Sequence, residues 1–219
     1  MTDYYSPDGG LPPQTTLHTG RAIFKEAYAF IPRGVMTDIV TSRFPNWDKT
    51  RAWILAKPLS GFAETFSQYI MEVRPKGGSL NPEPEVNAEG FLFVVSGQLD
   101  LDLDGAKYKM LEGGYAYISP NSGWKVVNSS TMNVTFHWIR KYYEKIDGFD
   151  VPDSFITNEK DIDPGGLTSQ QTNGIWSATY FVDPEDLRHD CHVNIVNFEA
   201  GGVIPFEETH VMEHGLYVL

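Results

Sequence analysis

The stretch Gln98-Leu-Asp-Leu-Asp-Leu-Asp104-Gly105 alternates polar and apolar residues from Gln98 to Asp104. Since successive side chains of a β-strand point to opposite faces, this period of two predicts a half-buried strand. Asp104 and Gly105 tolerate a positive φ, so they predict a hairpin turn at the end of that strand. The clearest element of the sequence is therefore a β-hairpin.

Similar short runs of β-branched and aromatic residues lie on both sides of this hairpin, separated by Gly, Pro, Asn or Asp. They cover residues 69–73, 91–95, 99–103, 115–118 and 134–139. No long stretch of the chain has a helical period. Short strands at this spacing predict an all-β fold, either a sandwich or a small barrel.

An internal repeat indicates two copies of one small domain. Shifting the chain by 125 residues lays segment 83–90 over segment 208–215. The flanks follow, with 69–73 over 194–198 and 92–94 over 217–219. The first copy continues to about residue 140, so by this repeat we expect a full-length chain of about 265 residues and a second copy that is truncated at its C-terminus.

The repeat predicts three parts of the chain. Residues 1–140 form an N-terminal barrel with a leading arm and no metal. Residues 141–171, rich in Asp, Pro and Gly, form a linker or crossing segment. Residues 172–219 form the first part of a C-terminal barrel that binds metal.

The predicted metal ligands are Glu208, His210 and His214, at positions i, i+2 and i+6. All have the same parity, so on extended structure they point to the same side. One carboxylate and two imidazoles leave coordination positions open, which suits Mn, Fe, Co, Ni or Zn and admits substrate or water. The alternative is that these are unrelated polar residues on a solvated strand and turn.

Other polar residues are weaker candidates. The first copy carries Glu83, Glu85 and Glu89 at the positions of the three ligands, and we expect these carboxylates at the surface or rim. His192 either lines the second barrel, where it would contact substrate, or is a hydrogen-bonded core or surface histidine. Tyr217, next to the metal motif, either faces the cavity as a substrate contact or belongs to the core.

The net charge of −12 and the pI near 4.8 argue against nucleic acid or an anionic membrane as a partner. Small molecules or other proteins remain as partners, and we expect a small-molecule substrate. The single Cys191 cannot form an internal disulfide, which fits a reducing compartment. The N-terminal residues do not have the pattern of a secretory signal, so we expect a cytoplasmic protein.

The stretch Gly114-Tyr-Ala-Tyr-Ile-Ser-Pro120-Asn-Ser-Gly123 resembles the second motif of the cupin family. That family places a histidine ligand shortly afterwards, whereas this chain has Val126, which favours a first barrel without metal. The order Glu208-x-His210-x-x-x-His214 resembles the ureidoglycine aminohydrolases. Segments 59–66, 112–117 and 208–217 strengthen this match, and the chain is also similar to bacterial glyoxylate-induced proteins of the same group.

The resemblance implies two cupin (double-stranded β-helix, jelly-roll) barrels, associated into a homo-oligomer. It also implies release of ammonia from (S)-ureidoglycine to give (S)-ureidoglycolate in purine (allantoin) breakdown, with Mn²⁺ as the cofactor. Glu208, His210 and His214 take the role of metal ligands. The family's glutamine ligand, and the lysine and tyrosines near substrate, are expected beyond residue 219.

Two further functions stay open at the sequence level, because cupin folds serve many activities. One is a non-catalytic protein with two cupin barrels that binds a small carboxylated metabolite through the metal. The other is a different metal-dependent cupin enzyme, such as an isomerase or a dioxygenase.

Overall fold

The computed structural model describes residues 22–25, 28–32, 44–56, 65–164, 176–204 and 213–219. The chain divides into two compact units, Met1–Thr41 and Ser42–Leu219. In the first unit, β1 (Ile23–Phe24) pairs antiparallel with β2 (Ala29–Phe30). Among the described residues, no helix has the length and apolar character needed to cross a membrane.

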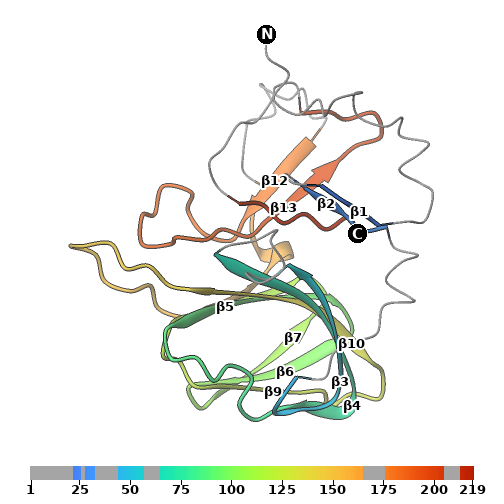
Figure 1. Ribbon diagram of the computed structural model, residues 1–219, viewed down its shortest axis with the longest axis vertical. Coiled ribbons are helices and arrows are strands. Elements are labelled where there is room, and N and C mark those ends of the chain that lie inside the picture. Colours follow the sequence, from blue (N-terminus) through green and yellow to red (C-terminus); the bar gives the residue numbers. More distant parts are fainter. Residues whose placement is uncertain (1–21, 26–27, 33–43, 57–64, 165–175, 205–212) are drawn as a thin grey trace. The chain divides into compact units, whose positions relative to one another are not determined.

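The second unit contains an all-β, nearly closed barrel (Figure 1). Its sheet follows the order β11-β8-β5-β10-β4-β9-β6-β7, and β3 pairs with β4. The strands are β3 (Trp47–Ala56), β4 (Phe66–Ser79), β5 (Ala88–Ser96), β6 (Gln98–Leu103), β7 (Ala106–Leu111), β8 (Gly114–Ile118), β9 (Trp124–Val127), β10 (Val134–Tyr142) and β11 (Phe155–Asn158). Each of the strands predicted from the sequence is present.

The predicted hairpin is confirmed as β6 and β7. Asp104 and Gly105 both have positive φ angles, of 50° and 86°, and the next residue begins β7. Along β6 the leucines are buried and the residues between them are partly exposed. The alternation in the sequence therefore correctly predicted a strand with one face in the core.

Strand β4 bends and so takes part in both halves of the barrel. Its first part pairs with β10 and β3, while Gly78 and Ser79 pair with β9. The bend contains Lys76 and Gly78, with φ angles of 59° and 138°. The buried Asn128 secures it, because its side-chain amide donates to the Val73 carbonyl at 2.8 Å.

Apolar side chains from both halves fill the interior of the barrel. Trp138 lies at the centre of an aromatic cluster, with its ring 5.4 Å from that of Tyr69 and 5.6 Å from that of Trp47. Val126, expected from the sequence at the place of a cupin histidine ligand, is fully buried in the same core. The interior of this barrel is therefore a packed hydrophobic core.

The sheet formed by β10, β5, β8 and β11 also buries its outer face. There Phe91, Phe93, Tyr115 and Tyr117 form a second apolar cluster, which Phe181 covers. The rings of Phe181 and Tyr115 stack with centroids 4.0 Å apart. Burial on both faces explains why β5 and β8 are buried nearly throughout instead of alternating between buried and exposed residues.

The segment predicted as a linker contributes to this sheet. Within it, β11 pairs antiparallel with β8, and a short 3-10 helix, η2 (Glu159–Asp161), follows. Asn158 caps that helix by accepting from the Lys160 backbone N–H at 3.1 Å. The crossing segment is thus partly a strand of the barrel sheet.

A separate two-stranded sheet follows, made of β12 (Trp176–Tyr180) and β13 (Asn194–Phe198). The two strands pair antiparallel, with Ala178 opposite Val196. The repeat aligns these strands with β3 and β4, which also pair antiparallel. The described residues after position 172 include only this pair of strands, so the second barrel stays a prediction.

Candidate functional site

Part of the predicted metal motif lies within the described residues. Glu208 and His210 fall outside them, whereas His214 and Tyr217 are described and exposed to solvent. The structure therefore locates one of the three predicted ligands and the neighbouring tyrosine.

The residues around His214 contact the beginning of β4. The Glu213 carboxylate accepts from the Thr65 backbone N–H at 3.1 Å and from its hydroxyl at 2.8 Å. Gly215 packs so closely on Gln68 that an added Cβ would lie 2.2 Å from the amide oxygen of that side chain. These contacts fix both neighbours of His214 against the outside of the barrel.

Tyr217 packs against His137 of β10. Their rings meet edge to face with centroids 4.4 Å apart, while 41% of Tyr217 remains exposed. His137 is 7% exposed, and neither of its ring nitrogens has a hydrogen-bond partner among the described residues. Burial lowers its pKa to about 4, so this imidazole is neutral at physiological pH.

His192, the other candidate for substrate contact, belongs to a different part of the unit. It is exposed, and its Nε2 atom lies 3.3 Å from the His189 carbonyl oxygen. His189 in turn packs its ring edge to face on Tyr117, with centroids 4.8 Å apart. The described contacts thus link His192 to the segment that covers β8, and link Tyr217 to β10.

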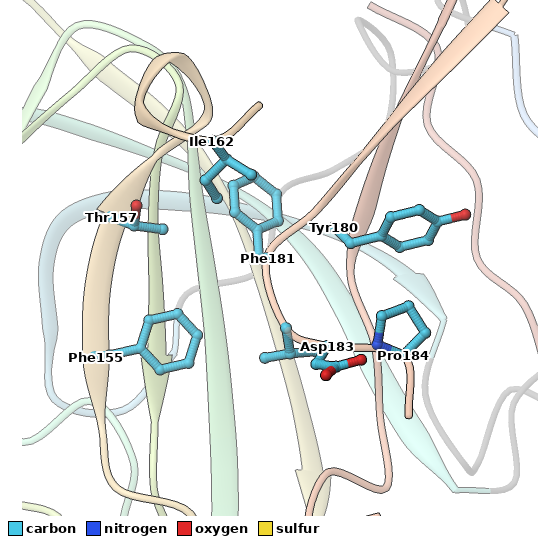
Figure 2. A pocket seen from close by; sticks show the side chains of 8 residues that line it. Phe155, Thr157, Ile162, Tyr180, Phe181, Asp183 and Pro184 are labelled. Atoms are coloured by element: carbon cyan, nitrogen blue, oxygen red, sulfur yellow. The ribbon is translucent and has the colours of Figure 1, made fainter. Parts of the chain in front are cut away.

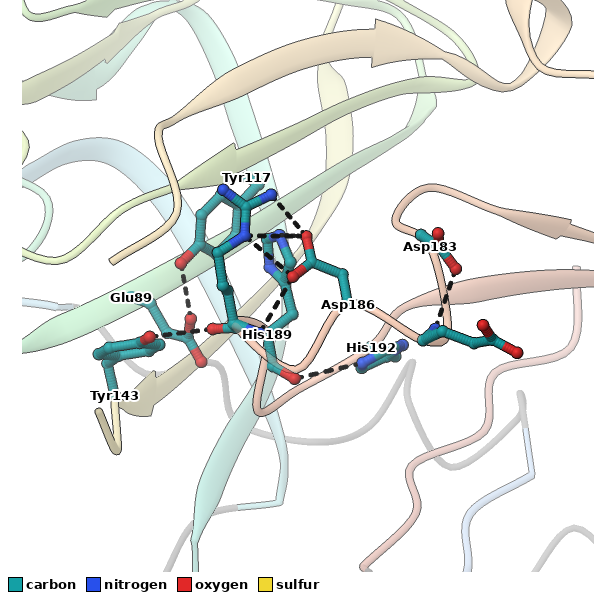
Figure 3. A network of polar contacts seen from close by, with 9 residues as sticks. Glu89, Tyr117, Tyr143, Asp183, Asp186, His189 and His192 are labelled. Carbon is teal, nitrogen blue, oxygen red and sulfur yellow. Dashed lines mark hydrogen bonds and ion pairs between the residues drawn. The ribbon is translucent and has the colours of Figure 1, made fainter. Parts of the chain in front are cut away.

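The structure reveals a buried polar network that sequence reasoning missed (Figure 3). Glu89, expected at the surface or rim, is 1% exposed, so that prediction is wrong. Its Oε2 atom accepts from the Tyr117 hydroxyl at 3.0 Å. Asp190 lies in the segment that covers this face, and its Oδ2 atom is 2.6 Å from the Lys141 ammonium. The signal in the sequence was Glu89 itself, directly before the apolar run of β5.

Glu83 and Glu85, the other two carboxylates of the first copy, also have partners. Glu83 forms an ion pair with Arg140 of β10, with N and O atoms 2.5 Å apart. Glu85 is exposed, as expected, and accepts from the Tyr142 hydroxyl at 3.0 Å. Among the described residues, no group of three or more His, Cys, Asp or Glu is arranged to hold a metal ion.

A second charged group lies beside the network (Figure 3). The Arg188 guanidinium donates to both carboxylate oxygens of Asp186, at 2.7 to 3.1 Å. Those hydrogen bonds lower the pKa of Asp186 to about 2. The pair is solvent-exposed and stabilises the loop only modestly.

The described residues also form an open, mostly apolar hollow of about 540 Å³ between β11 and the end of β12 (Figure 2). Phe155, Ile162 and Phe181 supply apolar walls, and Asp183 is one of the polar groups. This hollow contains neither the described metal candidate His214 nor Tyr217.

The comparisons with known proteins agree with this architecture. A family model described as a cupin domain matches residues 69–140, which begin within β4 and end within β10. A crystal structure of a glyoxylate-induced protein from Pseudomonas aeruginosa is 57% identical, with a TM-score of 0.80. The match covers 97% of this chain and 76% of that protein.

This chain belongs to the glyoxylate-induced protein family of cupins.

Two further comparisons are with Escherichia coli proteins. A curated protein of strain K12 named (S)-ureidoglycine aminohydrolase is 26% identical over 205 residues, which are 93% of this chain and 74% of that protein. The crystal structure of the protein Ylba is 25% identical, with a TM-score of 0.74, and the match covers 91% of this chain and 76% of that one. The resemblance to this family is confirmed.

Proposed function

We propose that this chain releases ammonia from (S)-ureidoglycine to give (S)-ureidoglycolate, in purine (allantoin) breakdown. The observation that carries the proposal is the similarity to the E. coli (S)-ureidoglycine aminohydrolase along 93% of this chain. The spacing of Glu208, His210 and His214 supports it. We also propose a cytoplasmic homo-oligomer that acts on a small molecule.

The proposed metal ligands are Glu208, His210 and His214, and the proposed metal is Mn²⁺. Two imidazoles and one carboxylate are donors that suit a divalent transition metal and leave coordination positions open. His214 fits this role because it lies at the surface, between two residues fixed against β4. When bound, the metal supplies Lewis-acid polarisation and orients the substrate.

The chain's own residues would complete the binding of substrate. Tyr217 is held by its ring contact with His137 and remains partly exposed. A phenol in this position donates a hydrogen bond to a carboxylate or carbonyl oxygen of the substrate. We assign Tyr217 this contact, and we assign His192 a weaker one.

The architecture proposed with this function has two cupin barrels, divided as residues 1–140, 141–171 and 172–219. The repeat in the sequence and the antiparallel pairing of β12 with β13 support it. The first barrel has a packed apolar interior, so the second is the one proposed to bind the metal.

The reaction class can be tested by following ammonia and dissolved oxygen together during incubation with fresh (S)-ureidoglycine. We expect ammonia release above the rate of spontaneous decay, with no oxygen uptake. Oxygen consumption that depends on iron would identify a dioxygenase instead. Stoichiometric binding of the substrate without turnover would identify a binding protein.

A further inference from the structure

A buried carboxyl pair joins the first barrel to the segment that covers it. Glu89 comes from β5, on the outer face opposite Lys141 of β10. Asp190 comes from residues 183–193, which form most of the connection from β12 to β13. Lys141, the register partner of Glu89 on β10, donates to Asp190 Oδ2 at 2.6 Å, so the two carboxyl groups flank one ammonium, and their interaction raises the pKa of Glu89 and lowers that of Asp190.

A hydrogen bond between the two carboxyl groups requires a proton. Glu89 Oε1 and Asp190 Oδ1 are both buried, and neither accepts from an N–H or O–H donor among the described residues. Two ionised carboxylates have only acceptor oxygens, so they cannot bond to each other. At short range in a buried site they would also repel strongly.

The surrounding donors decide which carboxyl holds the proton. Asp190 Oδ2 accepts from the Lys141 ammonium at 2.6 Å and from the Glu144 backbone N–H at 2.8 Å. Both contacts favour an ionised Asp190. Glu89 has a weaker donor, the neutral Tyr117 hydroxyl at 3.0 Å. The proton therefore resides on Glu89, which donates it to Asp190.

We infer that Glu89 and Asp190 share one proton, and that this proton fastens segment 183–193 to the outer face of the barrel. With Glu89 neutral, the single positive charge of Lys141 balances the single negative charge of Asp190. Loss of the proton would place a second negative charge in the same buried site. The groups that face the pair from the packed elements are Tyr115 and Tyr117 on β8, Lys141 on β10, Tyr143 after it, and His189 and Cys191 beside Asp190.

Protonation of Glu89 makes the free energy of unfolding depend on pH. Burial, then the hydrogen bond and charge of Asp190, raise the pKa of Glu89 from 4.5 to about 9. Burial alone would raise the pKa of Asp190, but its interactions with Glu89 and Lys141 lower that pKa. Between pH 4.5 and 9 the folded state thus holds a proton on Glu89 that the unfolded state has lost. The protonated Glu89 therefore stabilises the folded state most below pH 4.5. Between pH 4.5 and 9 the equilibrium constant for folding falls about tenfold per pH unit.

The test compares thermal unfolding of the wild type and Glu89→Gln from pH 5 to pH 9. Glutamine keeps the contacts of the protonated acid, because its amide donates to Asp190 and its carbonyl accepts from Tyr117. We expect Glu89→Gln to match the wild type near pH 5 and to exceed its Tm increasingly at higher pH, by about 3 °C per pH unit. The matched control is Glu85→Gln, which changes an exposed carboxylate and should follow the wild type throughout.

A second readout tests the fastening of the segment. We expect proteolytic cleavage within residues 183–193 to accelerate in the wild type above pH 9, relative to Glu89→Gln at the same pH. A ¹³C NMR spectrum of the carboxyl groups should show one protonated Glu at pH 7 that is absent from Glu89→Gln. The inference would be overturned if Glu89→Gln were less stable than the wild type by the same amount at every pH from 5 to 9. A spectrum with every carboxyl group ionised at pH 7 would overturn it as well.

Discussion

Replacing His214 by alanine is expected to weaken manganese binding by at least about a hundredfold, since groups that merely orient a ligand already cost ten- to hundredfold when removed. His214 is exposed, and its neighbours are held by Thr65 and Gln68, so the barrel should stay folded. Metal content after dialysis, measured by mass spectrometry, checks the loss. Thermal unfolding of the metal-free proteins checks the fold.

The matched control is His192→Ala, which removes another exposed imidazole of the same unit. It should retain manganese at the wild-type stoichiometry. Equal metal content in His214→Ala and the wild type would remove His214 from the ligand set. Loss of metal from both variants would point to a general disturbance of the unit.

Replacing Trp138 by alanine is expected to lower the free energy of unfolding by about 3 to 5 kcal/mol. Its side chain is 1% exposed and packs on Phe44, Trp47, Tyr69 and Trp124. Removing the indole leaves a cavity among rings that cannot collapse into it. Urea denaturation followed by circular dichroism measures the change.

Trp138→Phe provides the comparison. The indole N–H has no hydrogen-bond partner among the described residues, so phenylalanine removes an unsatisfied donor while keeping most of the ring contacts. It should recover more than half of the stability that alanine loses. Equal losses in the two variants would show that ring packing is not the dominant contribution of Trp138.

The strands of the barrel could be predicted because their residues carry local signals. Asp104-Gly105 ends β6 with the turn its residue types favour, and the leucines of β6 report one buried face. Strand β11 had no such signal. Its residues Phe155–Asn158 are partly exposed, and only the pairing with β8 makes them a strand.

The network around Glu89 could not be predicted for a related reason. Carboxylates are usually exposed, and burial of this one depends on partners distant in sequence, Tyr117 and Asp190. The metal motif is different, because the spacing of Glu208, His210 and His214 is itself the signal. What spacing cannot provide is the contact of Tyr217 with His137, which belongs to the other copy of the repeat.

The most direct test of the proposed function is the rate of ammonia release from freshly generated (S)-ureidoglycine, measured after chelation and again after addition of manganese. A reaction without enzyme sets the rate of spontaneous decay. We expect release that manganese restores and that is specific for the S enantiomer. A folded, manganese-loaded protein that does not exceed spontaneous decay would contradict it.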